Sequence, residues 1–182
     1  MEQKFTTSRI VTEAARNQFD SCYAMLQTLV DVCPKAIWQE VFSGVPFWYQ
    51  VYHVAYFVDY WFREVYNEDE FRSMRFDDRI PPEFETEIDP ALIISQQDMK
   101  EYLRRIHVKT TRIFDHLNDE GLALPIVPGQ EDHTYTDIIL SQIRHIMYNI
   151  GYLNGILRSR RSQESDWYAY NENEDLSYTY YN

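Results

Sequence analysis

The chain contains few of the residues that crosslink or bend a backbone. Its 182 residues include two cysteines, five glycines and seven prolines. Cys22 and Cys33 fall in what we expect to be one helix, which would separate their Cα atoms by roughly 16 Å, too far for a disulfide. The low glycine and proline content argues against a disordered or low-complexity chain. We therefore expect a packed globular domain with free thiols in a reducing compartment.

Long apolar runs and a signal sequence are also missing. The most apolar stretch, residues 51–62, contains His53 and Asp59, and a bilayer-spanning helix rarely holds such residues. The first residues, Met1 to Lys4, are polar and lead into no apolar h-region. We expect no membrane partner and a cytoplasmic location.

Positive charge is the third deficit. The chain has 17 basic and 29 acidic residues, which give a formal net charge of −12. The average surface field therefore repels the phosphates of nucleic acids and anionic membranes. The one dense basic cluster, Arg158, Arg160 and Arg161, ends an expected helix, where cations complement the helix dipole. We expect no nucleic-acid partner.

Apolar side chains at helical spacing are abundant. Hydrophobic residues make up 45% of the chain and aromatic residues 16%. Four segments repeat apolar positions at alternating spacings of three and four, which indicates helices packed in a bundle. We predict an all-α four-helix bundle with helices over residues 8–33, 45–67, 95–119 and 134–161. The second helix is apolar on almost every side, so it is either the most buried helix or meets a second copy of the chain.

Residues at the expected helix ends agree with these boundaries. Ser95 and Thr134 each precede an aspartate by three residues, which predicts capped helix starts. Pro46 suits the first turn of the second helix, and Gly121 is expected to terminate the third. Residues 68–94, which are acidic and contain three prolines, predict a long crossover of loop and short turns that lets the second and third helices run parallel.

The C-terminal segment differs from the rest in composition. We assign residues 1–161 to the bundle and residues 162–182 to an acidic, tyrosine-rich tail that also holds Trp167. We favour an arm that packs its rings on the bundle or on a second subunit. The alternative is a recognition tail for another protein.

Several catalytic motifs are absent: no phosphate-binding glycine-rich loop, CxxC pair, GxSxG elbow or HExxH sequence is present. Five histidines remain as candidates. His107 and His116 lie about half a turn out of phase on one expected helix, so they cannot face one site, and we expect both at the surface or its edge. His133 is expected in the loop before the fourth helix. His53 and His145 are the stronger candidates.

His53 lies in the middle of the most apolar helix, where its ring nitrogens need partners. His145 and Asn149 are four residues apart and project from one helix face. Such a pair facing a histidine on another helix can hold a metal ion and leave positions open. Hydrogen bonds from His53 to a tyrosine, or between His145 and Asn149, are the alternative, and two histidines alone favour it.

Two segments resemble the signature regions of the DinB/YfiT-like superfamily: WYQVYHVAY at residues 48–56 and HIMYNIG at residues 145–151. Members of that superfamily have a four-helix bundle with a histidine on the second helix and HxxxHxG on the fourth. The resemblance runs from the first helix to about Arg161. It implies that His53 and His145 bind a metal ion, and Asn149 stands where the family pattern has a third histidine.

The resemblance implies a bacterial, cytoplasmic thiol S-transferase or hydrolase that uses a divalent transition metal, nickel or zinc. Such an ion would lower the pKa of a bound thiol or water. The partners would be a small-molecule thiol or electrophile, with Tyr49 or Tyr56 donating a hydrogen bond to the substrate. Because an amide oxygen is a weaker ligand than imidazole, Asn149 predicts a weak or empty site, and either water or a nearby carboxylate such as Asp59 is a candidate to complete it.

Two other functions remain open. Asn149 favours a metal-free binding or stress-response module whose contact surface is the helix cavity or the tail. The apolar second helix favours a structural homodimer, and we expect a homodimer in either case. Gly151 and Gly155 are expected to let the fourth helix approach a neighbour closely.

Overall fold

The computed structural model describes residues 8–63, 68–84, 88–89, 91–127 and 130–169, and these residues are mainly helical. The long helices are α1 (Ile10–Val32), α3 (Phe47–Trp61), α5 (Gln96–His116) and α6 (Tyr135–Ser159). Short helices are α2 (Lys35–Trp38), α4 (Glu68–Ser73) and the 3₁₀ helix η1 (Gly121–Ala123). The predicted all-α class is therefore confirmed in its coarse form.

Two short antiparallel ribbons interrupt the helices. β1 (Val41–Phe42) pairs with β2 (Val45–Pro46), and β3 (Pro125–Val127) pairs with β4 (Gln130–Thr134). The first ribbon turns at Ser43 and Gly44, whose φ angles are 51° and 86°. Glycine tolerates that left-handed backbone, and Ser-Gly is a turn dipeptide. Neither ribbon was predicted, although this turn signal was present in the sequence.

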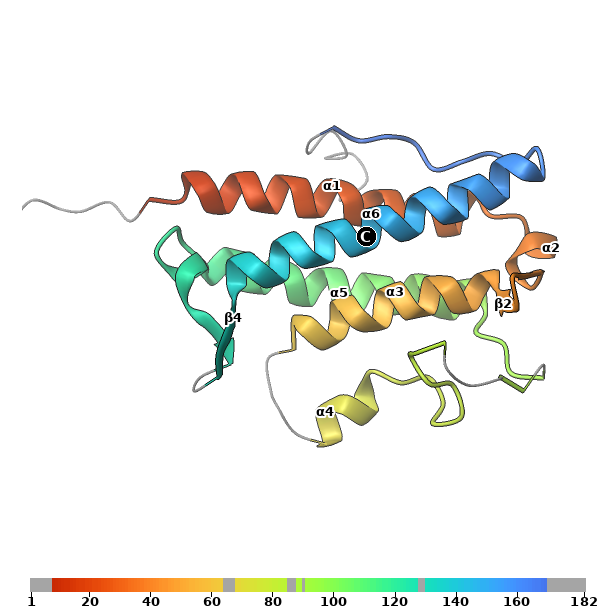
Figure 1. Ribbon diagram of the computed structural model, residues 1–182, viewed down its shortest axis with the longest axis horizontal. Helices are drawn as coiled ribbons and strands as arrows, with labels where there is room; N and C mark the ends of the chain where they lie inside the picture. The colour runs from red at the N-terminus through yellow and green to blue at the C-terminus, as the bar shows by residue number, and fades with distance from the viewer. Residues whose placement is uncertain (1–7, 64–67, 85–87, 90, 128–129, 170–182) are drawn as a thin grey trace, which may run out of the picture.

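The four long helices pack side by side. α1 contacts α5 and α6, and α3 contacts the same two helices. In Figure 1, α1 and α6 run in one direction while α3 and α5 run in the other. α3 and α5 are therefore parallel neighbours, and the described residues of the connection between them, including α4, lie on the outer side of α3 in Figure 1. Because α5 runs parallel to α3, it must start at the end of the pair where α3 starts. The chain therefore needs a long connection to return from the end of α3 to that point.

α3 is buried on almost every side, as its all-round apolar sequence predicts. The long helices cover only part of its surface. Residues of the 62–95 connection cover a further part, with Met74 and Ile80 buried in the core and Phe71 stacked on Tyr60 at 5.7 Å. The chain itself thus shields the face that the sequence left open to a second copy.

The predicted helix starts are confirmed. The side chain of Ser95 accepts a hydrogen bond from the Asp98 N–H, and Thr134 forms a full capping box with Asp137. Pro46 lies at the N-cap of α3.

Two predicted helix ends are wrong. α3 ends at Trp61 rather than near residue 67, and α5 ends at His116 rather than at Gly121. Gly121 instead opens η1, where its N–H donates to Asn118 Oδ1 at 2.7 Å. Both helices end where the backbone leaves α-helical angles, at Phe62 (φ −97°, ψ 23°) and at Leu117 (φ −85°, ψ 147°).

Gly151 and Gly155 do not have the predicted packing role. Both lie on the exposed face of α6, and a Cβ atom at either position would meet no atom within 4 Å. The closest helix contacts of α6 are made by its larger apolar residues on the opposite side.

The described part of the tail, residues 162–169, lies against α1 and α6. Gln18 Nε2 donates to the Ala169 carbonyl at 3.2 Å, and Asn154 Nδ2 donates to Ser165 Oγ at 2.9 Å. The tyrosines at 170, 178, 180 and 181 lie outside the described residues, so both interpretations of the tail stay open there. Among the described helices, none is both long and apolar enough to cross a membrane.

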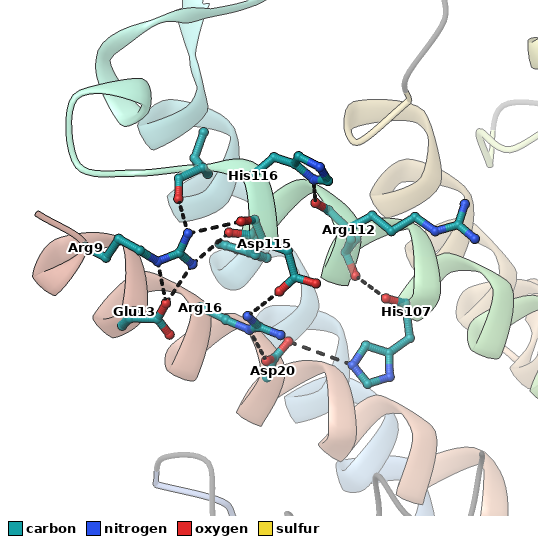
Figure 2. Close-up of polar contacts among 11 residues, drawn as sticks. Arg9, Glu13, Arg16, Asp20, His107, Arg112, Asp115 and His116 are labelled. Carbon is teal, nitrogen blue, oxygen red and sulfur yellow. Dashed lines mark hydrogen bonds and ion pairs between the residues drawn. The ribbon is translucent and has the colours of Figure 1, made fainter. Parts of the chain in front are cut away.

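A polar seam joins α1 to α5 (Figure 2). Arg16 bridges the two helices, with Nη1 2.8 Å from Asp115 Oδ1 and Nε 3.4 Å from Asp20 Oδ2. Arg9 donates to three carbonyl oxygens at the C-terminal end of α5 and so satisfies acceptors that have no partner within the helix. His107 faces Asp20 at 3.9 Å and is half-buried, at the edge of the surface as predicted.

His107 should make the stability of the protein depend on pH. Burial lowers the pKa of His107; the Asp20 carboxylate opposes this effect and Arg16 adds to it. His107 therefore binds fewer protons in the folded protein than in the unfolded chain below about pH 6.5. Its contribution to the free energy of unfolding is fully present above this pH and is lost as the pH falls. We expect the free energy of unfolding of H107Q to fall less than that of the wild type from about pH 7 to about pH 5.

Urea unfolding at several pH values checks this expectation, with H116Q as the control because His116 is exposed on the same helix. Burial raises the pKa of Asp20, which acts in the opposite direction, and D20N separates the two contributions. Equal pH slopes for H107Q and the wild type would contradict the prediction.

Candidate functional site

The structure brings together the two histidines that the sequence singled out. His53 lies on α3 and His145 on α6, and their Nε2 atoms are 3.2 Å apart. Their rings are inclined at 75° with centroids 5.2 Å apart. The two nitrogens therefore meet across the contact between the helices.

The other nitrogen of His53 fixes its tautomer. His53 Nδ1 lies 2.8 Å from the carbonyl oxygen of Pro82, in the connection that covers α3. A carbonyl oxygen only accepts hydrogen bonds, so Nδ1 carries the proton and Nε2 of the neutral ring keeps its lone pair. A backbone carbonyl on Nδ1 is also the contact that commonly orients metal-binding histidines.

Both rings are neutral at physiological pH. Burial lowers the pKa of His53. Burial, and then the charge of His53, lower the pKa of His145 to about 4. Neutral imidazole is the form that binds metal ions, so protons compete weakly at this pair near neutral pH.

A cleft of about 320 Å³ opens over the pair. Its lining residues come from α3 and α6: His53, Phe57, Trp61, Ser141, Gln142 and His145. Phe84 stacks on the His53 ring with centroids 4.3 Å apart and covers it from the side of the connection. The cleft is thus aromatic on the α3 side and polar on the α6 side.

A second cleft of about 290 Å³ adjoins the first and shares Trp61 and Ser141 with it. It extends toward the start of α6, where His133 and Arg144 line it and the His133 ring lies 5.5 Å from the Trp61 ring. His133 lies before α6, as predicted, and does not reach the pair.

Asn149 is close to the pair but has other partners. Its Oδ1 accepts a hydrogen bond from Gln50 Nε2 at 2.6 Å, and its Nδ2 donates to the carbonyl of His145 at 2.8 Å. The side chain is 3% exposed and is not among the residues that line the cleft. The amide therefore joins α6 to α3, and the structure gives it no contact that would make it the third metal ligand.

Tyr49 and Tyr56 face away from the cleft. The hydroxyl of Tyr49 donates to the carbonyls of Pro81 and Glu83, and burial raises the pKa of Tyr49 to about 12. The side chain of Tyr56 bonds to Arg75. Both tyrosines hold the connection over α3, so they position the segment that contains Pro82, and no contact supports their predicted role as substrate donors.

Asp59 does not complete the site, contrary to the expectation. Its carboxylate lies between α3 and α5, where it pairs with Lys109 and accepts a hydrogen bond from Tyr102 Oη at 2.9 Å. In the part of the chain that the structure describes, no three His, Cys, Asp or Glu residues gather closely enough to hold a metal ion.

The sequence reasoning missed Gln142, Phe57 and Trp61. Gln142 lies three residues before His145, a spacing that places both on one face of a helix. The family pattern instead points four residues forward from His145, to Asn149. Phe57 and Trp61 continue the stripe of His53 at intervals of four, so helical periodicity would have found them.

Comparison with known proteins finds no match: no family model, no curated protein and no solved structure is significantly similar to the chain. The resemblance to the DinB/YfiT-like superfamily therefore stays a prediction that rests on two short segments.

The contact between Gln50 and Asn149 should show direct energetic coupling. Because both groups lie between α3 and α6, Q50L and N149L should each lower the free energy of unfolding by about 1 to 2 kcal/mol. The double variant should lose less than the sum by about 1 kcal/mol. Urea unfolding of the four proteins measures this coupling.

Q50L combined with N154L is the control, because Asn154 bonds to Ser165 of the tail instead. That pair should be additive. Additivity of Q50L with N149L would show that the amide contact contributes nothing to stability.

Proposed function

We propose that the protein binds one divalent transition metal ion, nickel or zinc, between His53 and His145. The observation that carries this proposal is the 3.2 Å separation of the two Nε2 atoms. Two imidazole nitrogens bound at about 2.1 Å to one ion lie about 3.0 to 3.4 Å apart when the angle at the metal is between about 90° and tetrahedral. The observed separation falls within that range.

The surroundings of the pair also suit a metal ion. The Pro82 carbonyl orients His53, and the lowered pKa values keep both rings neutral. An ion held there with open positions would lower the pKa of a bound thiol or water. The aromatic wall formed by Phe57 and Trp61 suits the apolar part of a small electrophile. We propose a thiol S-transferase or, within the same chemistry, a hydrolase.

We further propose that the four long helices form the bundle of the DinB/YfiT-like superfamily, with residues 62–95 as its long crossover. A bacterial origin, a cytoplasmic location and a homodimer belong to the same proposal. Both cysteines are free and buried, and burial raises the pKa of Cys33 to about 12, so its thiol stays protonated. Unpaired thiols of this kind suit a reducing compartment. The excess of acidic residues argues against a nucleic-acid partner.

Metal content tests the proposal. Untagged protein, incubated with nickel or zinc and desalted, should carry about one metal ion per chain by plasma mass spectrometry. H53A and H145A should each lose the metal, because a single imidazole holds it too weakly. H116A is the matched control, since His116 is exposed at the end of α5, far along the chain from both ligands.

Circular dichroism should show that all variants keep their helices. Retention of metal by H53A and H145A would contradict the assignment of the site. Wild-type protein without metal after incubation would contradict the function.

The engagement of Asn149 with Gln50 favours a second candidate, a metal-free binding module. In that protein His145 Nε2 donates a hydrogen bond to His53 Nε2, and the cleft receives a ligand without catalysis.

N149H separates the two candidates. If the wild type is metal-free, restoring the histidine of the family pattern should create metal binding where none existed. If the wild type already binds metal through His53 and His145, N149H should leave its affinity within about threefold, because Asn149 Oδ1 is engaged by Gln50 and is not a ligand in that protein. Titration calorimetry with nickel chloride or zinc chloride measures both outcomes. A metal-free wild type whose N149H variant also stays metal-free would exclude a relic metal site.

A further inference from the structure

Gln142 has an unusual environment for an amide side chain. It lies on α6 and lines the cleft together with His53 and His145. The residue is 2% exposed, and its Oε1 atom has no contact with solvent and no hydrogen-bond partner. An unpaired acceptor thus belongs to a side chain on the wall of the cleft that holds the two imidazoles.

An unpaired buried acceptor needs an explanation. Nearly all buried polar atoms in folded proteins have a partner, because losing one costs free energy that no other contact returns. Tyr52 Oη is also unpaired in the described part of the chain, but its ring lies among those of Tyr49, Tyr56 and Tyr102. Gln142 Oε1, in contrast, belongs to a residue that lines a cleft with two potential metal ligands.

The chemistry of the pair indicates what the missing partner is. Two imidazoles provide one ligand fewer than the three protein ligands that catalytic zinc sites commonly have. An amide oxygen is an acceptor only, so its partner must be electropositive. A cation between His53 and His145 would satisfy this oxygen and gain the third ligand.

We propose that Gln142, and not Asn149, supplies the third protein ligand of the metal ion, through Oε1. This inference rests on the proposed function. The two amides differ in their contacts: Asn149 Oδ1 already accepts from Gln50 at 2.6 Å, whereas Gln142 Oε1 has no partner. Both positions lie on the His145 face of α6, three residues before it and four residues after it.

This ligand set has a chemical consequence. Two neutral imidazoles and a neutral amide leave the double positive charge of the ion uncompensated. The remaining coordination positions should therefore favour an anion, and a thiolate is the anionic form of the proposed substrate class. A carboxylate at position 142 would bind the metal more strongly but would reduce that preference.

Metal titrations of matched variants test the proposal. Apo protein prepared with a chelator is titrated with nickel chloride or zinc chloride alone, by calorimetry. Q142E should tighten binding by about tenfold or more because a carboxylate replaces an amide, and Q142L should weaken it by about tenfold or more. N149D and N149L make the corresponding changes, amide to carboxylate and amide to apolar, at Asn149. Their metal affinities should stay within about threefold of that of the wild type.

Binding of Co²⁺ gives a second measurement, one that would not change if Gln142 had only a structural role. The visible absorption bands of bound Co²⁺ report its ligands, so they should shift in Q142E and stay in place in N149D. Circular dichroism shows that each protein is folded, and Q142E carries the test if Q142L does not fold.

The outcomes are distinct. Wild-type affinity and an unshifted cobalt spectrum in Q142E would overturn the inference while the metal function stands. Changes confined to the Asn149 variants would also overturn it and would assign the ligand to Asn149. A wild type without metal would overturn both the proposed function and the inference, even if Q142E creates a metal site.

Discussion

The covering of α3 by its own chain is the constraint on which the candidate site depends. A helix that is apolar on nearly every side cannot leave one side in water, and its neighbours α5 and α6 do not enclose it. Residues of the 62–95 connection cover much of the remaining side, anchored by the bonds from Tyr49 to the Pro81 and Glu83 carbonyls. Between these anchors lies Pro82, whose carbonyl fixes the ring of His53. The need to bury α3 thus also sets the tautomer of the candidate ligand.

Much of this fold was predictable because its signals are local. Apolar periodicity located the four long helices, and the Thr134 box and the Ser95 cap fixed two of their starts. The end of α3 and the strand ribbons were missed, because hydrogen bonds with distant segments and tight turns decide them. Gly151 and Gly155 were misjudged for a related reason: a helical sequence shows which residues share a face but not whether a neighbour lies there.

The candidate site was predictable to the same extent. The family resemblance implied that His53 and His145 share one site, and the two side chains do meet in the structure. Their partners did not follow. Asn149 bonds to Gln50 and Asp59 to Lys109 because of rotations between helices that no spacing within one helix can reveal. Family resemblance directed attention to Asn149, although Gln142 lies as near to His145 along the same helix.

The contact between the two imidazoles alone allows a shared cation or an N–H···N hydrogen bond, since both fit a separation of 3.2 Å. The two arrangements differ in what they leave unpaired. A hydrogen bond between the rings satisfies both histidines and leaves Gln142 Oε1 without a partner beside them. A cation held by the histidines and, as proposed, by the amide oxygen would give all three groups a partner, while the Pro82 carbonyl keeps the proton on the far nitrogen of His53. Of the two arrangements, the metal-bound one would therefore leave fewer polar groups of this cleft without a partner.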